Sequence, residues 1–195
     1  MATVQRSAGA RQRRFSKAEY YRMGELGFFR GQRVELIEGK IMVLSPQGNL
    51  HAGLVDLVGE GLRDLFGPGH RVRAQLPVDL GEATEPEPDL AVFVGSKRQF
   101  LAGHPTSPLL IVEISDTTLA YDRGRKASLY ARAGIADYWI VNVNERQLEV
   151  YRDPVPDANE AFSHRYTSRT ELNAGASVSP LARPAASVAV SELLP

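Results

Sequence analysis

The stretch LLIVEIS, residues 109–115, constrains the fold of this chain more than any other stretch. A continuous apolar run of this length predicts a central β-strand that is covered on both faces of its sheet. Glu113 lies inside the run, where an ionised carboxylate without a partner would be strongly unfavourable. The sequence therefore predicts a central strand whose carboxylate needs a cation, a hydrogen-bond donor or a metal ion.

A helix is expected after this strand, beginning near Tyr121 or Asp122 and ending at Gly134. At about 100° per residue, one stripe of that helix holds Asp122, Lys126, Leu129, Tyr130 and Ala133. The last three of these residues are expected to face the core, so Lys126 starts from the core-facing side. A second stripe is expected to face solvent, and it holds Arg125, Ser128 and Arg132.

The remaining patterns place this strand and helix in a larger sheet. They predict a helix capped by Ser16, a hairpin turning at 38–40, an amphipathic helix over 51–67, strands over 71–80 and 90–94, a loop over 96–108, and a hairpin over 137–153 that turns near Asn144. Segment 153–180 is expected to hold one further strand and a loop, and 188–195 a last short element. This order favours an α/β fold with one mixed central β-sheet flanked by α-helices.

Length and composition narrow the class of protein. A chain of 195 residues suits a single domain, expected over 16–195 after a basic flexible tail over 1–15. The absence of cysteine excludes disulfides, zinc–cysteine sites and thiol catalysis. No apolar run approaches the ~20 residues that cross a bilayer, and the N-terminal stretch lacks the apolar segment of a secretory signal. We therefore expect a cytoplasmic protein with no membrane association.

Charge leaves the question of nucleic acid open. The net charge is zero, so any attraction for a phosphate backbone must come from a local basic surface. The arginines of the tail fit either a solvated segment or an arm that touches phosphates, and they are Arg6, Arg11, Arg13 and Arg14.

Three ionisable residues stand in apolar surroundings: Asp89 before the strand LAVFV, Glu113 inside LLIVEIS, and Lys126 on the apolar helix stripe. One interpretation is structural, with a Glu113–Lys126 ion pair and Asp89 capping a turn. The other is chemical, with both carboxylates holding Mg²⁺ while the lysine orients a water or stabilises negative charge. Without a His or Cys cluster, metal-assisted phosphodiester hydrolysis fits these residues better than zinc chemistry does.

Two longer segments, PEPDLAVFV and PLLIVEISDTTLAYDRGRKASLYARAGIADYWIVN, resemble the Uma-two family of restriction-endonuclease-like proteins, within the PD-(D/E)xK nuclease superfamily. The resemblance covers residues 16–152 and the C-terminal closing segment. Its most specific part is the ordered series PD, VE, DRGRK, LYARAG and YWIV. It implies a restriction-endonuclease-like core and an enzyme that hydrolyses DNA with Mg²⁺, for which Mn²⁺ could substitute.

The resemblance also implies roles for single residues. Asp89 of the Pro-Asp pair and Glu113 match the metal ligands, and Lys126 matches the lysine that assists the attacking water. Ser115 stands where the superfamily has its lysine, whereas the Uma-two pattern takes that lysine from the next helix. An early acidic strand and a histidine complete the family pattern, and they match Glu35 or Glu38 and His51.

The residues alone leave several of these roles open. Glu38 is expected to be a turn residue, Glu35 to be either structural or auxiliary, and His51 to be a capping or surface residue. Asp122 is interpreted first as a charge at a helix N-terminus. The candidates to line a pocket are Ser115, Asp116, Asp122 and Tyr130, with Tyr130 also an auxiliary site residue. The candidates to contact a DNA backbone are Arg123, Arg125 and Arg132.

Three functions follow from these patterns. The first is a Mg²⁺-dependent DNA endonuclease, and the alternative is a non-catalytic nucleic-acid-binding or protein-interaction module on the same fold. The third is a hydrolase of another phosphodiester, such as RNA. Trp139 is expected in the core, with a dimer contact as the alternative, and the resemblance alone favours a homodimer.

Overall fold

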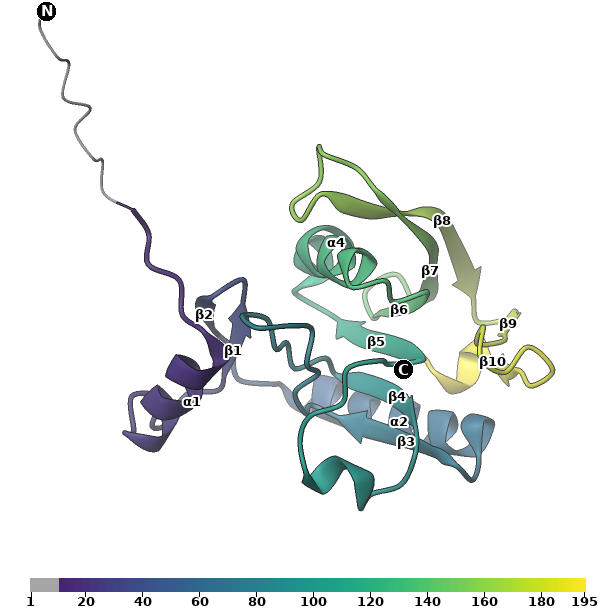
Figure 1. The fold of residues 1–195 in the computed structure, drawn as a ribbon. Coiled ribbons are helices and arrows are strands. Elements are labelled where there is room, and N and C mark those ends of the chain that lie inside the picture. The colour runs from purple at the N-terminus through teal and green to yellow at the C-terminus, as the bar shows by residue number, and fades with distance from the viewer. Residues whose placement is uncertain (1–10) are drawn as a thin grey trace, which may run out of the picture.

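A six-stranded mixed sheet forms the centre of the protein in the computed structural model, which describes residues 11–195 (Figure 1). Its strands, in spatial order, are β3 (His70–Ala74), β4 (Leu90–Val94), β5 (Leu110–Ser115), β6 (Asp137–Asn142), β7 (Gln147–Pro156) and β8 (His164–Asn173). Only β5 and β6 pair in parallel, and the other neighbours are antiparallel. The predicted mixed α/β sheet is confirmed.

The central strand β5 is buried along its whole length, as its sequence predicts. Because side chains alternate across a sheet, Val112 and Ile114 join the core on one face while Ile111 joins the core on the other. Glu113 lies on the same side as Ile111 and is 2% exposed. Trp139 on β6 is fully buried, which confirms its expected place in the core.

Helices cover both faces of the sheet. The amphipathic helix α2 (Asn49–Phe66) packs on one face together with the C-terminal segment, which contains β9 (Ser177–Val178), β10 (Val188–Ala189) and the 3₁₀ turn η3 (Val190–Glu192). Helix α4 (Ala127–Arg132) packs on the other face, and β7 and β8 curl beside it (Figure 1). A short 3₁₀ turn, η1 (Gln99–Leu101), lies in the loop between β4 and β5.

The N-terminal elements form a small lobe beside the sheet (Figure 1). Helix α1 (Lys17–Glu25) begins at Ser16, whose hydroxyl and the Glu19 side chain make the reciprocal bonds of a capping box. Strands β1 (Val34–Ile37) and β2 (Lys40–Val43) form the predicted hairpin, and Glu38 at its turn has a φ of 52°. A bridge from Leu36 to Glu85 connects this hairpin to the segment before β4.

The helix after β5 differs from a regular α-helix. It consists of α3 (Leu119–Tyr121), a π-helical turn η2 (Asp122–Lys126) and α4, and it ends before Gly134 at a φ of 73°. A π turn inserts an extra residue, so the 100° spacing used for the stripes does not hold across it. The prediction that Ala133 faces the core is wrong, because Ala133 is exposed.

The expected solvent-facing stripe is also partly wrong. Ser128 is only 2% exposed, and its hydroxyl oxygen accepts a hydrogen bond of 2.9 Å from the backbone N–H of Phe162. Phe162 lies in the loop between β7 and β8, so this long hairpin covers part of the surface that the helix pattern assigned to water.

Two further predictions need correction or completion. The strand expected over 71–80 is shorter, because Gln75 has a φ of 52° and ends β3 after Ala74. Segment 153–180 was predicted to hold one further strand and a loop, whereas it contains two strands, β8 and β9, and also the end of β7 as far as Pro156. Among the helices of residues 11–195, none has both the length and the apolar character that spanning a bilayer requires.

The predicted tail over 1–15 falls mostly on residues 1–10, including Arg6, which lie outside the described residues. Residues 11–15 contain no helix or strand. Arg13 pairs with Glu19 and Arg14 with Glu38, so these two arginines contact the body of the protein. The division into a tail and a single domain stays a prediction.

Candidate functional site

A cleft of about 530 Å³ opens between the β1–β2 hairpin, the start of α2, the adjoining ends of β4 and β5, and the π turn η2. Of the four residues predicted to line a pocket, Asp116 and Asp122 belong to its lining. Five other residues that the sequence singled out also line it: Glu35, His51, Asp89, Glu113 and Lys126. These residues come from five different elements or loops, so only the tertiary structure brings them together.

The antiparallel pairing of β4 and β5 places the two principal carboxylates beside each other. Leu90 pairs with Val112, which makes Asp89 a close neighbour of Glu113 across the strands. The Asp89 backbone N–H donates to Glu113 Oε2 at 3.2 Å, and the Ile114 backbone N–H donates to Asp89 Oδ2 at 2.8 Å. Each carboxylate therefore accepts a backbone N–H of the facing strand segment, and both lie on the same side of the sheet.

Lys126 points from the π turn into the same group. Its Nζ donates to Glu113 Oε1 at 2.8 Å and lies 4.0 Å from Asp122 Oδ1. Tyr130, one helical turn later, donates its hydroxyl to the same Glu113 oxygen at 2.7 Å. The Lys126 side chain is only 12% exposed, so it does not extend into bulk solvent. This contact is the ion pair of the structural interpretation, and it is equally the arrangement that the chemical interpretation requires.

Burial and neighbouring charges shift the protonation equilibria of this group. Burial raises the pKa of Glu113, although the Lys126 ammonium opposes this shift. Three groups donate to the Glu113 oxygens, namely Lys126 Nζ, the Tyr130 hydroxyl and the Asp89 N–H, and they favour its ionised form. Burial alone would lower the pKa of Lys126, but the carboxylates of Glu113, Glu35 and Asp122 raise it well above its usual value. Lys126 is therefore a cation at neutral pH, and it acts as a fixed positive charge rather than as a base.

His51 belongs to the site and is not a helix cap. Helix α2 has Gly48 as its N-cap, and His51 Nε2 lies 2.9 Å from Asp89 Oδ1. Gln75 Nε2 donates to the same oxygen at 3.2 Å. Burial would raise the pKa of Asp89, but His51, Lys126 and the Ile114 N–H lower it overall, so Asp89 is ionised. The prediction of a capping or surface role for His51 is wrong. Its position beside Asp89 agrees instead with its match to the histidine of the family pattern.

Glu35 and Asp122 add two more buried carboxylates to the cleft. Glu35 is 1% exposed, and its Oε2 accepts from the Glu87 backbone N–H, whereas its Oε1 has no hydrogen-bond partner among residues 11–195. Asp122 lies in the first turn of η2, as its interpretation as a helix N-terminal charge predicts, and it is buried and accepts hydrogen bonds from the hydroxyls of Ser115 and Thr118. Sequence reasoning missed Gln75 and Thr118, because neither stands in a recognisable motif.

The donor set fits a hard divalent cation. An ionised carboxylate offers about four lone pairs, and protein donors use three of them on Asp89 and three on Glu113. The remaining lone pairs lie on Asp89 Oδ2 and Glu113 Oε2, and Glu35, whose buried Oε1 has no hydrogen-bond partner among residues 11–195, lines the same cleft. Mg²⁺ typically binds through one or two carboxylates and keeps several waters. Across residues 11–195, no three His, Cys, Asp or Glu side chains form a ready-made metal cluster.

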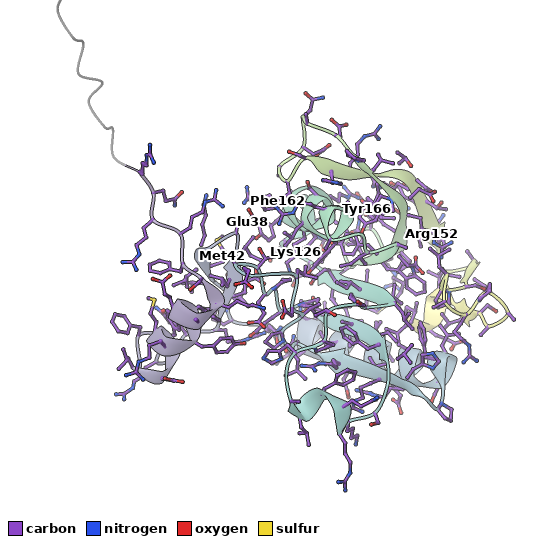
Figure 2. All side chains as sticks on the ribbon, viewed as in Figure 1. Glu38, Met42, Lys126, Arg152, Phe162 and Tyr166 are labelled. Atoms are coloured by element: carbon purple, nitrogen blue, oxygen red, sulfur yellow. The ribbon has the colours of Figure 1, made fainter. Side chains whose placement is uncertain are left out.

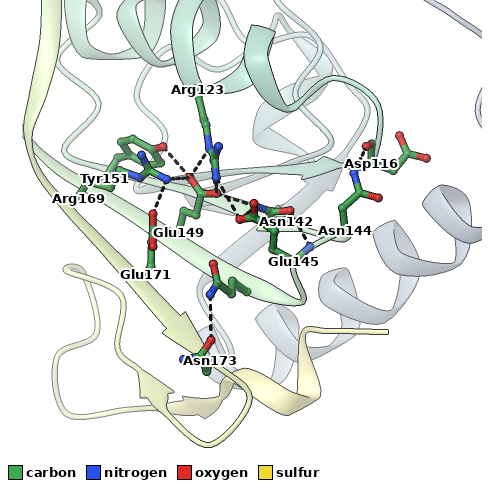
Figure 3. A network of polar contacts seen from close by, with 11 residues as sticks. Asp116, Arg123, Asn142, Asn144, Glu145, Glu149, Tyr151, Arg169, Glu171 and Asn173 are labelled. Carbon is green, nitrogen blue, oxygen red and sulfur yellow. Dashed lines mark hydrogen bonds and ion pairs between the residues drawn. The ribbon is translucent and has the colours of Figure 1, made fainter.

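The three arginines predicted to contact a DNA backbone have different surroundings. Arg123 donates from Nε and Nη2 to the fully buried Glu149, with a shortest distance of 2.6 Å (Figure 3). Arg125 and Arg132 instead lie over the ring of Phe162, at 5.0 and 5.2 Å from its centroid. Arg123 therefore anchors the π turn to the sheet, and only the other two are placed to face a ligand.

The fold and this group of carboxylates and lysine define a restriction-endonuclease-like α/β protein. A family model described as "Putative restriction endonuclease", Uma2, matches residues 18–189. The chain therefore belongs to the Uma2 family, as the sequence resemblance implied, and this membership supports the general class of nuclease.

One solved structure with the same fold is "a putative nuclease belonging to DUF820" from Anabaena variabilis ATCC 29413. The alignment covers 83% of this chain and 89% of that one, with a TM-score of 0.58 and 18% sequence identity. At this identity the likeness establishes the fold. Among curated proteins, none matches this chain.

Proposed function

We propose that this protein is a Mg²⁺-dependent endonuclease that hydrolyses phosphodiester bonds in DNA. The observation that carries the proposal is the Asp89–Glu113–Lys126 group, in which two adjoining carboxylates and one buried ammonium face a common cleft. Mn²⁺ is expected to substitute for Mg²⁺, because both ions accept oxygen ligands.

Asp89 and Glu113 would hold the ion through the lone pairs that protein donors leave free, with Glu35 able to contribute its unpartnered oxygen. When bound, the ion neutralises charge on the phosphodiester and increases the acidity of a water molecule. His51 and Gln75 fix the orientation of Asp89 through its other oxygen. Tyr130 and Lys126 do the same for Glu113.

Lys126 supplies positive charge beside the reacting phosphate. Because its pKa is raised, it keeps its proton at neutral pH and stabilises negative charge that develops during hydrolysis. It can also orient the attacking water by donating a hydrogen bond, since an ammonium has three donors and Glu113 uses one of them.

The test uses purified protein, supercoiled plasmid and Mg²⁺ or Mn²⁺, with EDTA as the metal-free control. Asp89→Asn and Lys126→Met are each expected to lower the nicking rate by at least about 100-fold, since each removes a charged group from the reacting centre. Asp64→Asn is the matched control, because Asp64 is an exposed carboxylate on α2 outside the cleft. Nicking that persists in EDTA, or that survives Asp89→Asn at full rate, would contradict the proposal.

Metal binding gives a second readout that does not depend on finding the right DNA. Calorimetry is expected to show Mn²⁺ binding to the wild-type protein, weakened strongly by Glu113→Gln and unchanged by Asp64→Asn. Binding that is unaffected by Glu113→Gln would instead favour the non-catalytic module on the same fold. The expected homodimer is part of this proposal, and light scattering of the purified chain tests it.

A further inference from the structure

A second hollow of about 410 Å³ lies apart from the cleft, between the β1–β2 hairpin, the helix η2–α4 and the loop that joins β7 to β8. We call it the basic pocket, and the side chains used in the argument are Arg14, Glu38, Lys40, Arg125, Arg132 and Phe162. Four of these six carry a permanent positive charge and only one is a carboxylate. The pocket is therefore strongly cationic, although the whole chain has no net charge.

The positive groups are held in place by the fold. Phe162 is fixed by its N–H bond to Ser128, and its ring lies beneath the guanidinium groups of Arg125 and Arg132. Glu38 accepts hydrogen bonds from Arg132 and from Arg14. Two guanidinium groups on one aromatic ring repel each other, so this arrangement favours an anion that can bind between them.

The pocket has more cations than its own carboxylate can neutralise. Within residues 11–195, neither Lys40 nor Arg125 has a carboxylate at salt-bridge distance, whereas Arg14 and Arg132 share Glu38. Guanidinium groups match the geometry of phosphate oxygens and bind them through two parallel hydrogen bonds. The chemistry of the pocket therefore fits a phosphate group.

The pocket and the cleft share the elements that separate them. Glu35 and Met42 of the β1–β2 hairpin line the cleft, while Glu38 and Lys40 of the same hairpin line the pocket. On the helix, Lys126 lines the cleft and the adjacent Arg125 lines the pocket. In Figure 2, Phe162 lies on one side of Glu38, whereas Met42 and Lys126 lie on its opposite side.

We propose that the basic pocket binds a backbone phosphate of the nucleic acid strand, at a position next to the phosphodiester held in the cleft. The inference depends on the proposed function only for the identity of that neighbouring phosphodiester. The pocket anchors the strand through charge and contacts no base, so it adds affinity without sequence preference. Lys40, Arg14 and Phe162 are thereby assigned to substrate binding together with Arg125 and Arg132.

The test measures binding in EDTA, where no cleavage is needed. Fluorescence anisotropy of a labelled DNA duplex gives Kd for the full chain between 50 and 200 mM NaCl, a range over which phosphate contacts weaken strongly. Arg125→Gln is expected to raise Kd about tenfold and to reduce the slope of log K against log salt by about one. Lys40→Gln is expected to act in the same direction, and both residues carry side chains that reach solvent, so folding is retained.

Arg98→Gln is the matched control, because Arg98 is an exposed arginine on the β4–β5 connection and does not line the pocket. It is expected to leave Kd and the salt slope unchanged within about twofold. Equal Kd values for Arg125→Gln and the wild type would overturn the inference, and so would a wild-type chain that binds no nucleic acid.

A separate arm distinguishes a backbone phosphate from a free one. Inorganic phosphate that stabilises the wild type but not Arg125→Gln against heat, with no change in duplex affinity, would assign the pocket to the free ion and overturn the inference. The nuclease proposal is tested independently. If no plasmid is ever cut but Arg125→Gln still weakens duplex binding, the pocket stands and the nuclease proposal fails.

Discussion

Replacement of the buried Glu149 by glutamine tests how the π turn that carries Lys126 is held on the sheet. Glu149 on β7 is 0% exposed, and its carboxylate accepts from Arg123, from Tyr151 Oη at 2.7 Å and from Asn142 Nδ2 at 3.0 Å, with Arg169 at 3.2 Å (Figure 3). Glutamine keeps the shape but replaces one acceptor oxygen by a donor, so Arg123, whose side chain is 30% exposed, loses part of its buried partner.

The expected cost follows from this geometry. Breaking a buried ion pair on one side typically costs about 3–5 kcal/mol, and glutamine keeps one acceptor, so we expect about 3 kcal/mol for Glu149→Gln. For a chain of this length, that loss lowers Tm by roughly 6–12 °C. Glu171→Gln is the control, because Glu171 pairs with the same Arg169 on the surface, where a pair contributes at most about 1 kcal/mol.

The same variant makes a prediction about pH. Burial alone would raise the pKa of Glu149, but hydrogen bonds from Arg123, Tyr151 and Asn142 bring it below the usual 4.5. A group whose folded pKa is lowered contributes stability that is present above the unfolded pKa and is lost as the pH falls through the folded pKa. The free energy of unfolding should therefore differ most between the wild type and Glu149→Gln at pH 7, and this difference should shrink below about pH 4.5. Urea unfolding at several pH values measures it, and an unchanged difference at pH 3.5, or a loss below about 1 kcal/mol at pH 7, would refute this reasoning.

Three further variants test other parts of the structure by urea unfolding. Tyr130→Phe removes the hydroxyl that donates to Glu113, and we expect the free energy of unfolding to fall by about 1–2 kcal/mol. An unchanged urea midpoint would contradict that contact. Gly39→Ala places a Cβ 2.6 Å from the Arg14 Cβ, at a backbone φ of 70° that alanine disfavours. The free energy of unfolding is expected to fall by about 1–3 kcal/mol, and an unchanged value would contradict the strain argued for this turn. Asp137→Ala leaves the side chains of Trp139 and Arg152 without their buried acceptor, so a loss of at least about 3 kcal/mol is expected, and a loss under 1 kcal/mol would refute it.

Local sequence patterns predicted the features that depend on residues close together in the chain, such as strand burial and the hairpin turn. The run LLIVEIS predicted a strand buried on both faces, because a continuous apolar segment has no side that water can favour. The hairpin turn follows from Gly39, because glycine accepts its φ of 70° without steric cost. Asp89 directly precedes one predicted strand and Glu113 lies inside another, and the metal interpretation and the family resemblance expected them together. The pairing of β4 with β5 places them side by side.

Long-range packing decided what local patterns could not. The π turn shifts the helix phase, so the position of Ala133 was predicted wrongly, and the β7–β8 hairpin covers Ser128 from 34 residues further along the chain. His51 joins Asp89 across 38 residues, a contact that no spacing rule encodes.

The sequence by itself determined that a carboxylate would be buried in a central strand and that it would need a cation. The sequence also proposed Lys126 as that cation. The tertiary structure decided the contact itself, because two elements must pack together before their charges can meet. It also decided that Arg123 turns inward to Glu149 while Arg125 turns outward to the basic pocket. Charged side chains two positions apart on a helix point in different directions, and only the surrounding surfaces determine which of them meets a buried partner and which meets solvent.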